Sequence, residues 1–177
     1  ALLDKTAKKK LRELDSHLAK LSLTFGEHVL ADSQAYELHV ENKEGLKGLP
    51  NAVIEMAKSV AKQKEKNGWI FTLDYPSYVP FMTYAEDRRL RKEMSIAFGK
   101  RGFQKNDNNN TEIILKIVSL RQQRAELLGY KSHADFVLEE RMATSVKTVQ
   151  KFLDDLNSKA KPSAQKEWET MKSFAKK

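Results

Sequence analysis

The first regular pattern in the chain is a seam of apolar residues near the N-terminus. From Ala7 onward the apolar positions fall four and three residues apart, at Leu11, Leu14, Leu18, Leu21 and Phe25. This spacing places them along one side of an α-helix for about three turns or more. Such a seam must pack against another helix, and we expect an intramolecular bundle contact. The alternative is a coiled-coil dimer, which normally needs heptads that continue further.

Two short stretches further along alternate between apolar and polar residues, the pattern of half-buried strands. Their apolar positions are Tyr36, Leu38 and Val40 in the first stretch and Trp69, Phe71 and Leu73 in the second. Between them a helical stripe starts after Pro50, which suits the first turn of a helix, and ends near Asn67-Gly68. The pattern predicts a short two-stranded antiparallel ribbon near residues 36–40 and 69–73, with one helix joining its strands.

The next segment, residues 74–80, contains Pro76 and Pro80. Each proline lacks a backbone donor and pushes the residue before it toward extended geometry, so we expect an ordered loop here. Helical periodicity resumes over about residues 84–100 and ends at Arg101-Gly102, where glycine can adopt the left-handed conformation that closes a helix.

The second half of the chain is predicted to be helical with short breaks. After a polar loop, Asn109 and Glu112 have the spacing of a helix N-cap pair. The apolar stripe that follows consists of Ile113, Ile117, Leu120, Leu127 and Leu128. A short helix is expected over about residues 133–140, and Ser145 can cap a final helix. The apolar phase of that helix survives Pro162, which predicts one long helix kinked there.

These elements define an all-α chain, mainly a helical bundle, with one short ribbon. At 177 residues, of which 40% are hydrophobic, one domain over residues 1–177 is expected. The helical pattern is already running near Ala1, from which we expect a fragment of a larger protein. No apolar run of about 18 residues occurs, so no membrane partner is expected. The absence of cysteine favours a reducing, cytoplasmic location.

The net charge of +8 is the feature that favours a nucleic-acid partner. The basic residues are spread out, however, with the densest group at Lys8-Lys9-Lys10 and mixed signs in the interior, as in Glu86-Asp87-Arg88-Arg89. Solvated helix faces explain this distribution better than a phosphate-binding surface does. A stand-alone basic module that binds nucleic acid or a protein partner is therefore the alternative and not the leading hypothesis.

The residue types that carry chemistry do not form a catalytic pattern. The four histidines are His17, His28, His39 and His133, and no two are four residues apart, as a helical zinc site requires. Adjacent carboxylates point about 100° apart on a helix and so do not share a substrate. They occur at Glu86-Asp87, Glu139-Glu140 and Asp154-Asp155. Arg121 and Arg124 could bind a substrate carboxylate, but pairing with acidic residues such as Glu126 or those of neighbouring helices is simpler. We expect no catalytic, cofactor-binding or metal-binding residue here.

The residues nevertheless resemble a known family. The stretch from Phe71 to Met82, with Asp74-Tyr75-Pro76-Ser77-Tyr78-Val79-Pro80 at its centre, is similar to the proline-tyrosine segment of the oligopeptidase A, peptidyl-dipeptidase and thimet oligopeptidase family. Further similar positions follow in that family's order at Arg91, Leu120-Arg121, Ala125 to Tyr130, Ala134-Asp135-Phe136, Arg141-Met142-Ala143 and Ala160-Lys161-Pro162. The resemblance extends from about Leu11 to the C-terminus.

The resemblance implies a mostly helical, two-lobed zinc metallopeptidase that cleaves short peptides in a deep channel. The family binds zinc through His-Glu-x-x-His on one helix and a glutamate on a later one, and the chain lacks this motif. Zinc is therefore expected in the intact parent and no cofactor in this segment. The segment would supply channel wall and scaffold, pack against the C-terminal catalytic lobe and be inactive alone. No residue separates a peptidyl-dipeptidase from an oligopeptidase, and overall similarity leans toward the dipeptidase.

Overall fold

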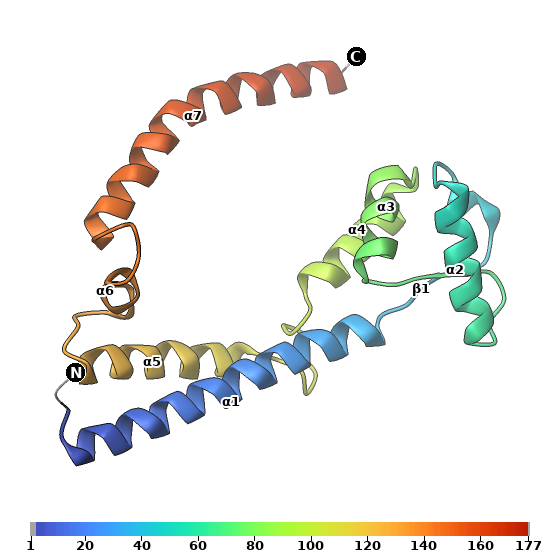
Figure 1. Ribbon diagram of the computed structural model, residues 1–177. Coiled ribbons are helices and arrows are strands. Elements are labelled where there is room, and N and C mark those ends of the chain that lie inside the picture. Colours follow the sequence, from blue (N-terminus) through green and yellow to red (C-terminus); the bar gives the residue numbers. More distant parts are fainter. Residues whose placement is uncertain (1–2, 177) are drawn as a thin grey trace. The chain divides into compact units, whose positions relative to one another are not determined.

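The computed structural model describes residues 3–176. The contacts divide the chain into two compact units: unit 1 comprises Ala1–Ser16 and Val118–Lys177, and unit 2 comprises His17–Ile117. Helices α1 (Lys5–Ala35) and α5 (Thr111–Leu127) contribute to both units, because the unit boundaries fall inside them. Figure 1 shows a mainly helical chain, which confirms the predicted fold class. A single domain over the whole chain stays a prediction.

The predicted ribbon is present in unit 2. Strands β1 (Leu38–Val40) and β2 (Trp69–Phe71) pair antiparallel. The register places Leu38 opposite Phe71, His39 opposite Ile70 and Val40 opposite Trp69. A short 3-10 helix η1 (Lys43–Leu46), which the sequence pattern did not predict, and helix α2 (Asn51–Gln63) connect the two strands. Figure 1 shows this compact part in cyan to green.

Apolar side chains from the ribbon and the surrounding helices form the core of unit 2. Phe71 and Phe81 are fully buried, with ring centroids 4.6 Å apart, and Tyr78 stacks on Phe98 at 4.1 Å. The other buried members are Leu38, Val40, Leu46, Leu49, Val53, Ala57, Leu73, Ala85 and Met94. Each large apolar side chain that leaves water stabilises the fold by about 1.5–3 kcal/mol, so this cluster holds unit 2 together.

The prediction of a loop over residues 74–80 is wrong, because helix α3 (Tyr75–Tyr84) contains both prolines. Pro76 lies in the first turn, where a backbone donor would have no partner inside the helix. Pro80 lies in the interior and removes one backbone hydrogen bond from the helix. The next residue, Phe81, is completely buried against the core, and this packing offsets the lost bond.

Helix α4 (Arg88–Gly99) begins about four residues later than predicted. The reason is Asp87, whose carboxylate accepts hydrogen bonds from the amides of Arg89 and Leu90 at 2.8 and 3.1 Å and so fixes the helix start. After α4, Gly102 has φ of +69°, the left-handed conformation expected for a residue that closes a helix.

Unit 1 contains the first half of α1, most of α5, α6 (His133–Leu138) and α7 (Val146–Ala175). Leu14 of the predicted seam is buried in this unit, as is Ala125 of α5, which favours the intramolecular contact over the coiled-coil dimer. Ser145 caps α7, and the helix continues through Pro162 without a break, drawn as a curved ribbon in Figure 1. Among residues 3–176, no helix is both long and apolar enough to span a bilayer.

Candidate functional site

The four histidines lie apart from one another and have different surroundings. His28 Nδ1 lies 2.9 Å from the side-chain oxygen of Asn110, and His39 lies on β1. His17 is exposed on α1, and His133 begins α6. Within residues 3–176, no three side chains of the types His, Cys, Asp and Glu gather closely enough to hold a metal ion.

Arg124 is paired with a neighbouring helix, as the simpler interpretation predicted. Its Nε lies 3.0 Å from Asp15 Oδ1 on α1, and its guanidinium carbon lies 4.9 Å from the centre of the Phe136 ring. These contacts join α1, α5 and α6 inside unit 1. Burial, together with the positive charges of Arg121 and Arg124, lowers the pKa of His133.

A groove lies between α6 and α7 in unit 1. It has a volume of about 500 Å³. Its lining is apolar except for His133 and Gln150, and the apolar members are Ala134, Val137, Leu138, Val146, Val149 and Leu153. The groove continues the apolar face of α7 at the start of that helix.

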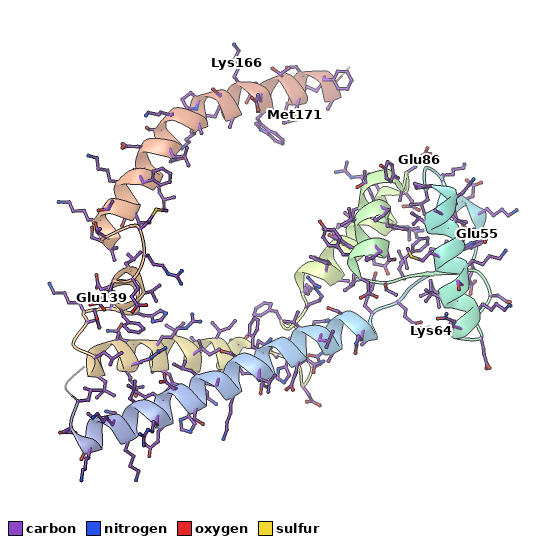
Figure 2. All side chains as sticks on the ribbon, viewed as in Figure 1. Glu55, Lys64, Glu86, Glu139, Lys166 and Met171 are labelled. Carbon is purple, nitrogen blue, oxygen red and sulfur yellow. The ribbon has the colours of Figure 1, made fainter. Side chains whose placement is uncertain are left out.

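The apolar face of α7 is exposed along the helix. The helix has 30 residues and no buried one, which corresponds to a length of about 45 Å. Its large apolar side chains are 52–79% exposed at Phe152, Leu153, Leu156, Trp168, Met171 and Phe174. Figure 2 shows Met171 on the concave side of α7 and Lys166 on the opposite side. An apolar stripe of this size is typical of a helix that packs against a further structural element.

Unit 2 contains a buried polar anchor that the hydrophobic pattern did not predict. Asp32 of α1 is only 3% exposed. Its carboxylate accepts hydrogen bonds from the Gly102 amide at 2.7 Å and from the side chains of Asn108, Asn106 and Gln104 at 2.8, 2.9 and 3.4 Å. Burial alone would raise the pKa of Asp32, but these donors outweigh it and lower that pKa below its usual value. The asparagine-rich run at 106–110 was the one sequence signal for this anchor.

The fold and this surface define a mainly α-helical chain with a small ribbon and one extended apolar face. The family model of Peptidase family M3 matches residues 81–177, more than half of the chain. The chain therefore belongs to peptidase family M3, which confirms the family that its residues resemble.

Curated relatives agree with this assignment. Oligopeptidase A of Haemophilus influenzae is 35% identical over 93% of this chain and 25% of its own length. Oligopeptidase A of Escherichia coli is 33% identical over 98% of this chain and 26% of its own length. Dipeptidyl carboxypeptidase of Escherichia coli is 30% identical over 94% of this chain and 25% of its own length. The chain thus spans about a quarter of the length of these relatives.

Proposed function

We propose that this chain is a non-catalytic helical segment of a zinc metallopeptidase that hydrolyses short peptides, in which it forms scaffold and substrate-channel wall. Membership of peptidase family M3 and the chain's coverage of about a quarter of its relatives support this role. Zinc and its ligands then belong to the C-terminal catalytic lobe of the same polypeptide, and the segment alone is inactive. The cytoplasm is the proposed location, and one relative is named a probable cytosolic oligopeptidase A.

The exposed apolar face of α7 is the observation that carries this proposal. Six large apolar side chains at half exposure or more leave a long stripe in contact with water. Covering a stripe of this kind stabilises a protein by about 25 cal/mol for each Å² of apolar surface removed from water. The catalytic lobe is the proposed cover. The stand-alone basic module is not favoured, because the chain belongs to a peptidase family.

A pair of charge-changing variants in the intact polypeptide tests this role. Met171→Glu places a carboxylate on the concave apolar side of α7, whereas Lys166→Glu places one on the opposite side of the same helix. We expect Met171→Glu to reduce peptide hydrolysis at least about tenfold and to open α7 to limited proteolysis, because a buried unpaired charge is costly. Lys166→Glu should retain activity and protease resistance. Equal behaviour of the two variants would contradict the packing of this face.

The mode of cleavage is a finer part of the proposal. Relatives named for either mode match this chain: the bacterial relatives named oligopeptidase A are 32–35% identical to it, and the dipeptidyl carboxypeptidase is 30% identical. Hydrolysis of a peptide whose C-terminus is amidated separates the two, because a dipeptidase that requires a free terminal carboxylate leaves it intact. Metal analysis of the intact polypeptide tests the zinc.

A further inference from the structure

A second cavity lies wholly within unit 2, between the end of α1, α2, β2 and the first turn of α3. Its volume is about 390 Å³, within the range of sites that hold small molecules. Its apolar lining residues, which we call the floor, are Met56, Ala57, Val60, Ile70 and Pro76. Its polar lining residues, which we call the rim, are Ser33, Gln34, Lys64, Thr72, Asp74 and Ser77.

The two charged residues of the rim lie toward opposite ends of the cavity. Lys64 follows the last residue of α2, and the chain then reverses into β2, so that Asp74, beyond β2, lies back toward the middle of α2. There α2 contributes Ala57 to the lining. Ala57 and Lys64 are seven residues apart along α2, a rise of about 10 Å. From this rise we estimate a separation of about 10 Å between the positive and the negative group along the cavity.

Neither charged end is neutralised by its neighbours. Glu37 pairs with both Lys64 and Lys66, with Lys66 Nζ 2.7 Å from Glu37 Oε2, so two ammonium groups face one carboxylate. At the other end, Asp74 accepts a hydrogen bond from the Thr72 hydroxyl at 3.0 Å and has no ion pair within the described chain. One positive charge remains in excess at the Lys64 end and one negative charge at the Asp74 end.

We propose that this cavity binds a free apolar dipeptide, with its carboxylate at Lys64, its amino group at Asp74 and its side chains on the floor. Two extended residues span about 7 Å, and a charge-assisted hydrogen bond of about 2.8 Å at each end brings the total to about 13 Å, comparable with the separation estimated for the two charged groups. A tetrapeptide is too long by about two residues. The inference goes beyond the proposed function, because no zinc, catalytic residue or packing of α7 takes part.

Methyl NMR of the 177-residue chain, labelled with ¹³C at the methionine methyl groups, tests this site with Val-Leu as the probe. The sequence contains five methionines. Met56 lines the cavity, whereas Met94 is buried in the core of the same unit and serves as an internal reference. We expect the Met56 signal, assigned through Met56→Leu, to shift saturably while the Met94 signal stays in place. N-acetylated and C-amidated Val-Leu should bind at least about tenfold more weakly, because each loses one charged contact.

Three variants complete the test. Lys64→Gln and Asp74→Asn should each raise the Kd of Val-Leu by about tenfold or more, since each removes one charged end. Lys62→Gln is the matched control: Lys62 is an exposed lysine in the last turn of α2 that neither lines the cavity nor pairs with Glu37, and the Kd should stay within about twofold. An unchanged Met94 signal shows that a variant is folded. A Met56 signal without saturation, equal binding of blocked and free peptides, or equal loss in Lys62→Gln and Lys64→Gln would overturn the proposal.

Discussion

Asp32 orders a loop that has no regular secondary structure of its own. The side chain is buried, and its two oxygens accept hydrogen bonds from one amide and three side-chain amide groups of residues 102–108. A buried carboxylate is costly unless donors surround it, and here the donors come from a run of polar residues that would otherwise stay in water. One residue of α1 therefore fixes the path of the chain between α4 and α5.

Replacing Asp32 by Asn should destabilise unit 2 by about 2–3 kcal/mol, because the new amide group presents hydrogens to donors that need an acceptor. Urea unfolding at pH 7 measures this loss. Asp107→Asn is the control, since Asp107 lies in the same loop and is exposed. The structural role of Asp32 is refuted if both variants unfold at the same urea concentration as the unsubstituted chain.

The stability of unit 2 should depend on pH through Glu37, and the two lysines beside this residue determine the direction of the effect. Hydrogen bonds from Lys64 and Lys66 lower the pKa of Glu37 from 4.5 to about 2. A carboxyl group with a depressed pKa stabilises the fold above pH 4.5, and this contribution is lost as the pH falls to 2. Glu37→Gln should therefore reduce stability at pH 7 by about 1 kcal/mol or less, because the lysines are partly exposed. The difference in stability between this variant and the unsubstituted chain should vanish near pH 2. Urea titrations at several pH values measure it. Glu55→Gln is the control: Glu55 is exposed on α2 and has no ion pair among the described residues, so its replacement should leave stability at pH 7 unchanged.

At the scale of elements, periodicity predicted the helices and the ribbon well. The exception is α3, where the two prolines led to the prediction of a loop in place of a helix. The ribbon was found because Leu38 and Val40 face the core while His39 does not, a difference that alternation records directly. The helix through Pro76 and Pro80 could not be found this way. Its stability depends on Phe81 packing into a core that is assembled from distant parts of the chain. Local rules give the cost of a proline but not the tertiary packing that offsets it.

The turn that leads into β2 depends on a glycine. Gly68 has φ of +86°, and an added Cβ would lie 2.4 Å from the carbonyl oxygen of Val40 on the paired strand. Gly68→Ala should therefore destabilise unit 2 by about 2 kcal/mol or more, from backbone strain and this clash. Gly26→Ala is a control of opposite sign: Gly26 lies inside α1 with open space around it, and alanine there should add about 0.5–1 kcal/mol of stability. Thermal unfolding of both variants measures the contrast, and two shifts in the same direction would contradict it.

At the scale of the whole molecule, the sequence predicted the family and the pairing of Arg124 but not the two polar sites of unit 2. The proline-tyrosine segment and the motifs after it carry the family resemblance in sequence order, so they can be recognised without a structure. Asp32 and the charged rim of the cavity draw on residues up to 76 positions apart, as in the bond between Asp32 and Asn108. No local pattern records such pairs. The exposed face of α7 was predicted in part. The apolar periodicity of this helix could be read from the sequence, but the sequence did not show that no element of the described chain covers that face.

The discontinuity of unit 1 has a consequence for how the chain is made. Unit 2 is one continuous stretch of about one hundred residues, and it separates the two parts of unit 1 in sequence. A ribosome adds that many residues in about 5–20 s. During this interval the helices against which Leu14 and the rest of the first half of α1 finally pack have not yet been made. Unit 2 is free to fold in that time, whereas the first half of α1 must wait for residues 118–177 before unit 1 can form.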